Sequence, residues 1–306
     1  VYTSVDQPFS QPVFEAFENQ TGICVRAVYD TEETKSTGVL NRLIAESRSP
    51  QADVFWSNDP VRPFVLIERG LVEPYNSSSA ADIPAAFKAA DSTWTGIAAR
   101  ARVLLVNTDK VRADQMPRSI RDLADARWTG QTAIANPLFG TTTMHVAALF
   151  AHWGDDRARA FLDELKANDV RIASSNGEVK RLVASGEVAF GLTDIDDADE
   201  AMTNGAHVTI VYPDQDGEGT PIMPTVVALM KRGPHANNGR RLVDYLLSAE
   251  TETRMTESAH MPLRTDVTAP STLRAVGKLR AFPMDYPHVA KTMERIQPIL
   301  RMWTGL

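Results

Sequence analysis

Hydrophobic and polar positions follow two periods along this chain, and their alternation predicts an α/β protein. Short apolar runs at residues 1–5 and 52–56 have the length of buried strands. Between them, apolar side chains recur every four positions from Phe9 to Phe17, which predicts one buried face of a helix that stops at Gly22. Strands that alternate with helices in this way form mostly parallel sheets flanked by helices.

The middle third of the chain repeats the alternation, with short apolar runs that each precede a helical pattern. Two long extended stretches, near residues 96–107 and 208–230, frame this part and predict two strands that cross between two α/β lobes. We expect the loops at the strand ends of both lobes to face a cleft, because ligands bind at the carboxyl ends of parallel strands. The predicted lobes are residues 1–97 with 226–278 and residues 98–225 with 279–306.

Composition narrows the class of protein. The chain has 306 residues, 43% of them apolar, and a net charge of −7, which argues against a broad basic surface for nucleic acid. No apolar run approaches the roughly 18–20 residues that span a bilayer. The single cysteine, Cys24, excludes an internal disulfide, and its apolar surroundings predict a buried thiol in a strand. A chain that begins at Val1 with a strand fits either a mature exported protein or a trimmed chain.

A candidate anion site lies between residues 133 and 153. A short apolar strand is followed by a turn, by Gly140 and three threonines that include Thr141 and Thr142, and then by an apolar helix that ends at Gly154. Free N–H groups and the positive dipole end of a helix, with hydroxyl donors beside them, can bind an anion. The alternative is that one threonine is only an N-cap.

A run of acidic residues follows the apolar strand at 188–192 and contains Asp194, Asp196 and Asp197. As a functional feature it is a carboxylate cluster for an oxygen-preferring metal or an ammonium group, with Asp194 and Asp196 on the same side of the strand end. The alternative is an acidic helix N-terminus, which the helix dipole favours. A donor cradle and carboxylates in one lobe suit a ligand with an anionic and a cationic part, or a metal held with an anion.

Enzyme motifs are absent from the sequence, which has no G-x-S-x-G elbow, no phosphate-binding P-loop and no G-x-G-x-x-G. His145 and His152 are seven residues apart, too far for an i,i+4 zinc pair, and are expected to be core or groove histidines. An enzyme that uses Asp194 or Asp196 as a general base is the alternative to a binding protein. Arg264 is expected to be a structural salt-bridge partner.

Six short motifs stand in the same order as in a known family: residues 1–4 (VYTS), 16–23 (AFENQTGI), 52–56 (ADVFW), 68–71 (ERGL), 125–130 (DARWTG) and 262–266 (PLRTD). With them the chain resembles, over nearly its full length, the ferric-iron-binding type of extracellular solute-binding proteins of ABC importers. The resemblance implies a type II periplasmic-binding-protein clamp that closes on one ligand and has two crossing hinge strands. It also implies a location in the periplasm or at the cell surface, a membrane permease as partner, and no enzymatic activity. We expect a monomer.

The resemblance predicts the anion site better than the metal site. Iron-binding members typically hold the metal with two adjacent tyrosines, which Ile195 and Asp196 replace here. A histidine of the family is matched by Asp6 and a glutamate by Asn58, whereas Gly140 and Thr141 match the helix start that holds the anion. Asn176 and Thr193 match further polar anion-binding positions, the second with a changed residue type.

Relatives in the broader group carry phosphonates, sugar phosphates or thiamine. The expected ligand is therefore a small phosphonate, phosphorylated or zwitterionic compound, or ferric iron with a synergistic anion; no other cofactor is expected. If a metal binds, Asp6 and Asp196 are its predicted ligands. The predicted ligand-binding residues are Ser4, Asp6, Thr31, Asn58, Asp59, Gly140, Thr141, Thr142, Asn176, Thr193, Asp194 and Asp196.

Overall fold

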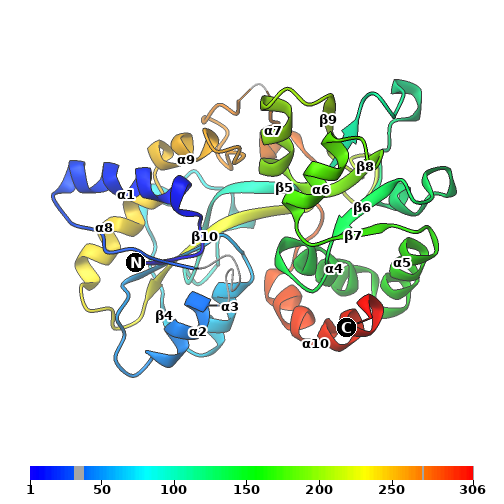
Figure 1. Cartoon of the computed structure of the whole chain (residues 1–306). Helices are drawn as coiled ribbons and strands as arrows, with labels where there is room; N and C mark the ends of the chain where they lie inside the picture. The colour runs from blue at the N-terminus through cyan, green and yellow to red at the C-terminus, as the bar shows by residue number, and fades with distance from the viewer. Residues whose placement is uncertain (31–37, 271, 306) are drawn as a thin grey trace. The chain divides into compact units, whose positions relative to one another are not determined.

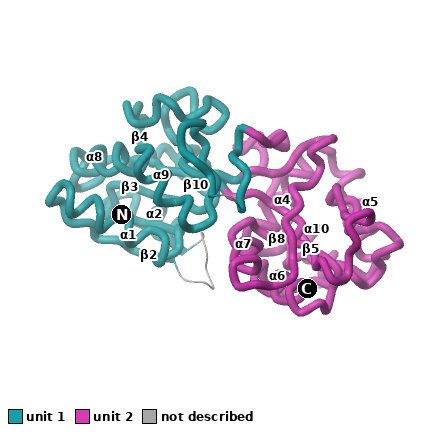
Figure 2. The backbone as a smooth tube through the Cα atoms, turned by 90° about the horizontal axis from the view of Figure 1, so that it is seen from above, with its two compact units in different colours: residues 1–99, 223–277 teal, residues 100–222, 278–306 magenta. Residues whose placement is uncertain are grey.

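A computed structural model describes residues 1–30, 38–270 and 272–305. The chain divides into two compact units, residues 1–99 with 223–277 and residues 100–222 with 278–306 (Figure 2). These boundaries differ from the predicted lobes by one to three residues at each point where the chain passes from one unit to the other. Each unit has its own sheet and core and is described separately.

In the described part of the first unit, neighbouring strands pair in the order β2-β1-β3-β10-β4. β1 is parallel to β2 and β3, and β10 is antiparallel to β3 and β4. The strands are β1 (Tyr2–Thr3), β2 (Val28–Tyr29), β3 (Val54–Ser57), β4 (Val72–Glu73) and β10 (Ile222–Met230). The helices are α1 (Gln7–Thr21), α2 (Gly38–Ala45), α3 (Arg62–Glu68), α8 (Ala236–Leu246) and α9 (Ala249–Thr256).

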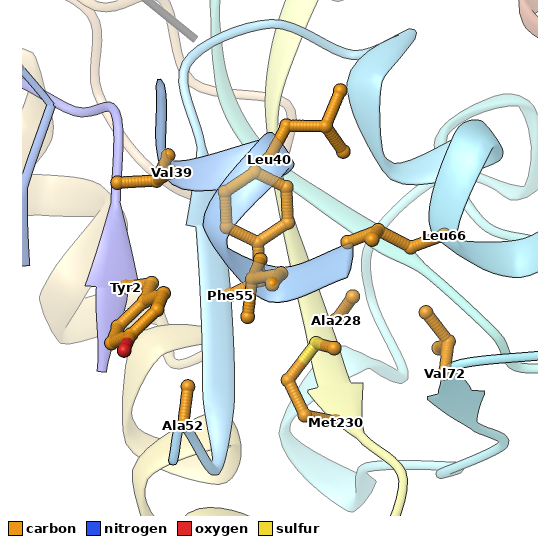
Figure 3. Packing of buried hydrophobic residues seen from close by; sticks show 10 residues of the cluster. Tyr2, Val39, Leu40, Ala52, Phe55, Leu66, Val72, Ala228 and Met230 are labelled. Atoms are coloured by element: carbon orange, nitrogen blue, oxygen red, sulfur yellow. The ribbon is translucent and has the colours of Figure 1, made fainter. Parts of the chain in front are cut away.

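Successive side chains of β3 point to opposite faces of the sheet, and both faces are packed. Phe55 belongs to a cluster of buried side chains from the sheet and from α2 and α3, among them Tyr2, Leu40 and Leu66 (Figure 3). Its neighbour Trp56 is fully buried, and its ring lies edge-on to that of Phe14 of α1 at 5.7 Å. Trp56 is therefore a core residue.

The second unit contains the sheet β9-β5-β8-β6-β7, in which β6 is parallel to β7 and β8, while β5 is antiparallel to β8 and β9. The strands are β5 (Thr95–Asn107), β6 (Thr132–Ala135), β7 (Arg171–Ala173), β8 (Phe190–Asp194) and β9 (Val208–Val211). Helices α4 (Gly140–Trp153), α5 (Asp155–Ala167) and α10 (Tyr286–Thr304) cover one face, and α6 (Asn176–Ala184) and α7 (Ile195–Thr203) the other (Figure 1).

Short 3-10 helices occupy several connections: η1 (Ser78–Ala80), η2 (Ala85–Phe87), η3 (Ala113–Gln115), η4 (Ile120–Ala124), η5 (Ala126–Trp128) and η6 (Val276–Lys278). Among the residues described, no helix combines the length and the apolar character that a membrane span requires.

Two expectations from the sequence are wrong in detail. The strand expected at residues 23–29 is reduced to Val28–Tyr29, because the N–H of Val25 donates to the Glu18 carboxylate at 2.5 Å rather than to a neighbouring strand. Cys24 consequently lies on the surface and is exposed, not buried. Within the extended stretch 208–230, as expected, strands β9 and β10 are joined by a turn, in which the N–H groups of Gly217 and Gly219 donate to the main-chain oxygen of Asp214.

Candidate functional site

A buried ion pair joins two strands of the second unit. Arg102 of β5 lies directly opposite Asp194 of β8 in the antiparallel register, and Nη1 of Arg102 is 2.8 Å from Oδ1 of Asp194. The Arg102 side chain is completely buried. Arg100, two residues earlier on the same face of β5, places Nη1 3.4 Å from Oδ2 of Asp194. One carboxylate is therefore flanked by two guanidinium groups.

Three helices begin beside this ion pair, because β6, β7 and β8 are parallel and end at the same edge of the sheet. Thr141 is in the first turn of α4, and its Oγ1 donates to Oδ2 of Asp194 at 2.8 Å. Asn176 is the first residue of α6, and its Nδ2 donates to the same oxygen at 3.2 Å and to Thr141 Oγ1 at 2.9 Å. Asn176 is 35 positions from Thr141 and 18 positions from Asp194 along the chain, and the three residues meet at the carboxylate of Asp194.

The threonine hydroxyls of the predicted cradle also accept hydrogen bonds from Arg102. Its Nη1 donates to Thr141 Oγ1 at 3.2 Å and to Asn176 Oδ1 at 3.0 Å, and its Nη2 donates to Thr142 Oγ1 at 3.1 Å. Its Nε is buried and has no acceptor among the described residues. Thr193 is linked to the ion pair through Asn176, because its Oγ1 donates to the main-chain oxygen of Asn176 at 3.2 Å.

The two arginines set the charge of the cluster. Burial by itself would raise the pKa of Asp194, but Arg102 and Arg100 hold that pKa below its ordinary value, so the carboxylate is ionised. His145, one turn along α4 from Thr141, is buried, and burial followed by the charge of Arg102 lowers its pKa to about 3. His145 is therefore neutral, and neither ring nitrogen has a partner among the described residues.

Main-chain N–H groups at the start of α4 are the donors that the cluster leaves unused. The N-cap residue is Phe139, which has no side-chain oxygen to cap the helix and is 63% exposed. Gly140 has a φ of +58°, which favours glycine. In the described part of the chain no acceptor is found for the N–H groups of residues 140–142, as first-turn geometry requires. The positive dipole end of α4 is therefore open to an anion.

Carboxylates lie on the α7 side of the cluster. Oδ2 of Asp196 is 3.5 Å from Nη1 of Arg100, and Asp197 is paired with Lys180 at 3.4 Å. Burial, followed by the charges of Asp196 and Asp194, raises the pKa of Asp197 to about 6. Carboxylate oxygens of all three aspartates lie within 4.8 Å of one another. This is a group that can attract a cation, although Arg100 and Lys180 already balance part of its charge.

In the first unit, the predicted residues Ser4, Asn58 and Asp59 make hydrogen bonds within and between the loops that follow β1 and β3. Ser4 Oγ accepts from the N–H of Asn58 at 2.9 Å, which joins the loops after β1 and β3. Asp59 Oδ1 accepts from the N–H of Val61 at 2.8 Å, and Oδ2 of Asp59 forms an ion pair with Arg62 at 3.4 Å.

Asp6 and Thr31 are the other two predicted residues of this unit. Asp6 precedes α1 as its N-cap without a side-chain capping bond. Thr31 lies outside the described residues. The structural role expected for Arg264 is confirmed, because it forms a buried ion pair with Glu252 at 2.8 Å.

Arg100 and Arg102 are the residues of the cluster that were missed by sequence reasoning. A signal for them is present, since the two arginines stand at alternate positions of an otherwise apolar stretch. Alternation puts both on one face of a strand, and a charged side chain in a buried strand requires a partner. The apolar character of the stretch predicts a long strand, which the structure confirms as β5.

Comparisons with known proteins extend over most of the chain. A family model described as bacterial extracellular solute-binding protein matches residues 49–284. A putative 2-aminoethylphosphonate-binding periplasmic protein from Salmonella typhimurium is 30% identical over 269 residues, 86% of this chain and 76% of the relative. Iron uptake protein A1 from Synechocystis is 25% identical over 260 residues, 81% and 70% of the two chains. The crystal structure of iron-bound HitA from Pseudomonas aeruginosa has the same fold, with a TM-score of 0.86, 22% identity, and coverage of 98% and 97%.

Proposed function

The chain belongs to the bacterial extracellular solute-binding proteins, and from this premise we propose that its ligand is a small phosphonate or phosphate that also carries an ammonium group. The protein is a periplasmic solute-binding protein of an ABC importer and not an enzyme. The predicted α/β periplasmic-binding-protein fold is confirmed by the likeness to HitA. One observation carries the ligand proposal: the uncapped first turn of α4 and the carboxylates of Asp196 and Asp197 both adjoin the Arg100, Arg102 and Asp194 cluster.

The anionic end of the ligand is assigned to the first turn of α4. The N–H groups of residues 140–142 and the helix dipole supply donors and positive potential without a side chain. Arg100 adds a formal charge close by, since Arg100 and Thr141 both contact Oδ2 of Asp194. Thr141, Thr142 and Asn176 hold Arg102 and Asp194 in place, so their contribution to affinity is mainly through positioning.

The ammonium end is assigned to Asp196 and Asp197 at the start of α7. Asp196 makes only a long contact with Arg100, at 3.5 Å, and its Oδ1 has no partner among the described residues. The raised pKa of Asp197 follows from the crowding of negative charge there, and an ammonium group would relieve it. The 30% identical relative is named for a ligand with this combination of charges, 2-aminoethylphosphonate.

The alternative of an enzyme with a general base at Asp194 or Asp196 fails on family, and for Asp194 it fails on chemistry as well. A general base works best when its pKa lies near the operating pH. The two arginines hold the pKa of Asp194 below the ordinary range, which makes it a weak base.

Delivery of the ligand to an ABC permease in the membrane, by a monomer, is the remaining part of the proposal. The family supports the permease as partner. The monomer remains a prediction, and size-exclusion chromatography with light scattering would measure it.

Ferric iron with a synergistic anion is the second candidate, supported by the three clustered aspartates and by the relative named as an iron uptake protein. Asp6 and Asp196 remain the predicted metal ligands. The guanidinium groups of Arg100 and Arg102 argue against a trivalent cation at the aspartates, because like charges repel at this range.

Titration calorimetry tests the proposal with two ligands that differ only in the ammonium group. We expect 2-aminoethylphosphonate to bind with one site per chain and ethylphosphonate to bind at least about tenfold more weakly, because it lacks the charge-assisted contacts. Asp196→Asn should remove this difference, whereas Glu200→Gln, an equal change of charge at an exposed position of the same helix, should keep it. Equal affinities for both phosphonates would contradict the ammonium site. Binding of ferric iron with phosphate, and of neither phosphonate, would establish the second candidate instead.

A further inference from the structure

We propose that Asp194 is a specificity-determining positioning residue, whose carboxylate takes the place of an anion among the side-chain donors of the site and so excludes a second, inorganic anion from that position. The inference rests on the proposed location of the ligand site but not on the identity of the ligand. It changes the role predicted for Asp194, from a group that touches the ligand to one that decides which ligands fit.

The geometry around the carboxylate is that of a bound anion. Oδ2 accepts from Thr141 Oγ1 at 2.8 Å and from Asn176 Nδ2 at 3.2 Å, and Oδ1 accepts from Arg102 Nη1 at 2.8 Å. Arg100 adds a contact to Oδ2 at 3.4 Å. These are a hydroxyl, an amide and two guanidinium groups, the donors that proteins use to hold phosphate or carbonate. In this protein the carboxylate of Asp194 occupies the position among these donors that a bound anion would take.

Burial holds the Asp194 carboxylate in this position. Asp194 is 3% exposed and Arg102 is not exposed, so neither is free to turn toward a ligand without opening the cluster. Arg102 is also held by Thr142 and Asn176. Since the charge of Arg102 is already balanced by Asp194 at 2.8 Å, Arg102 has little electrostatic demand for another anion.

A consequence for selection between ligands follows. An anion that arrives on its own, such as inorganic phosphate, finds Thr141, Asn176 and Arg102 already bound to Asp194 and must rely on the main-chain N–H groups of α4 and the nearby charge of Arg100. A phosphonate that is also anchored through its ammonium group at Asp196 needs no more than those N–H groups. Asp194 therefore disfavours a metal that needs a separate anion and favours a zwitterion that brings both charges in one molecule.

The experiment removes the carboxylate and asks whether an anion replaces it. Asp194→Ala deletes both its charge and its volume, whereas Asp194→Asn keeps the volume and is the matched control for space. Glu200→Gln controls for the change in net charge. Each protein, and the wild type, is titrated with inorganic phosphate in a chloride buffer at constant ionic strength, by calorimetry and by thermal unfolding.

We expect Asp194→Ala to bind phosphate at least about tenfold more tightly than the wild type, and the two control variants to show no gain. Phosphate binding by the wild type that is as tight as by Asp194→Ala would overturn the proposal, because the donors would then be open. A folded Asp194→Ala protein that gains no phosphate binding would also overturn it.

If Asp194→Ala does not fold in chloride, phosphate should restore its thermal transition, since it supplies the missing negative charge; failure of that rescue counts against the proposal. The phosphonate ligand is titrated into the wild type separately. Absence of phosphonate binding would reject the proposed ligand while leaving a gain of phosphate binding by Asp194→Ala intact, so the two proposals fail independently.

Discussion

Among the described residues, each unit contains a buried arginine–carboxylate pair at 2.8 Å, and the two pairs differ in a way that bears on the proposed ligand site. Arg264 and Glu252 in the first unit and Arg102 and Asp194 in the second are both 2.8 Å apart, with side chains exposed by no more than 4%. Burial and distance alone therefore do not distinguish them. The difference lies in the groups that complete the hydrogen bonds of each pair.

Main-chain groups surround the pair of the first unit. Nη2 of Arg264 donates to the carbonyl oxygens of Ser79 and Leu247, and Oε1 of Glu252 accepts from the N–H of Leu263 at 2.6 Å. Such a pair joins backbone segments that are far apart in the sequence, and its role is to hold the fold.

Side chains surround the pair of the second unit. Thr141, Thr142 and Asn176 all contact Arg102, and they come from the first turns of two helices whose positive ends lie at one edge of the sheet. Side-chain partners can be exchanged for those of another ligand in the course of evolution without a change of backbone. This arrangement of partners supports the proposal that the pair belongs to the ligand site.

The largest expected effect separates the two pairs by stability. Arg264→Met leaves the buried Glu252 charge without a partner and should lower the free energy of unfolding by about 3–5 kcal/mol. Urea denaturation measures this, and Glu250→Gln, which breaks an exposed pair with Arg254, is the control with an expected loss of about 0.5 kcal/mol or less. The folded fraction of Arg264→Met should keep wild-type affinity for the ligand. A loss of affinity there would remove the distinction between the pairs.

The matching change in the second unit should affect both properties. Arg102→Met leaves Asp194 with only the longer contact to Arg100, at 3.4 Å, and should lower the free energy of unfolding by about 3 kcal/mol. It also frees Thr141 and Asn176 from their common donor, so we expect ligand affinity to fall by at least about tenfold. Calorimetry on the folded protein measures the affinity. Unchanged affinity would show that Arg102, like Arg264, only holds the fold.

A smaller effect is expected from the hydroxyl that links α4 to the cluster. Thr141→Val removes the donor to Asp194 Oδ2 at 2.8 Å and the acceptor of Arg102 Nη1 at 3.2 Å, but it leaves the N–H groups of α4 in place. Affinity should fall about tenfold, since a hydrogen bond to a charged group contributes roughly 1.5–3 kcal/mol. Ser119→Ala, which removes a capping hydroxyl elsewhere in the same unit, serves as control for a general loss of stability. An affinity equal to that of the wild type would exclude Thr141 from the site.

The comparison also explains what could be predicted from the sequence. Helix α4 runs from Gly140 to Trp153 and ends at Gly154, as its local start and stop signals predicted. The acidic segment was correctly placed at the end of a strand. The pairing of Arg102 with Asp194, 92 residues away, depends on the antiparallel register of β5 and β8, and no local pattern specifies that register. Thr141 was therefore predicted as a donor to the ligand, while its partners in the structure are Asp194 and Arg102.

The smallest expected effect is a dependence of the free energy of unfolding on pH, and it arises beside the pair of the second unit. Asp197, next to the cluster of the second unit, has a pKa raised from 3.8 to about 6 by burial and by the neighbouring aspartates. The native protein thus binds a proton at Asp197 more tightly than the unfolded chain does, and this contribution to stability is complete below about pH 4. It is lost as the pH rises through about 6, where the ionised carboxylate is less stable in the native state.

We therefore expect Asp197→Asn to be more stable than the wild type by about 1 kcal/mol at pH 7.5 and to differ little from it at pH 4.5, with part of the gain offset by the lost pair with Lys180. Urea denaturation at both pH values measures the difference. Glu200→Gln removes the other acceptor of Lys180, at 2.6 Å, and should show no such dependence on pH. If the difference between Asp197→Asn and the wild type is the same at both pH values, Asp197 is ionised throughout. The crowding of negative charge that assigns the ammonium end of the ligand to α7 would then be absent.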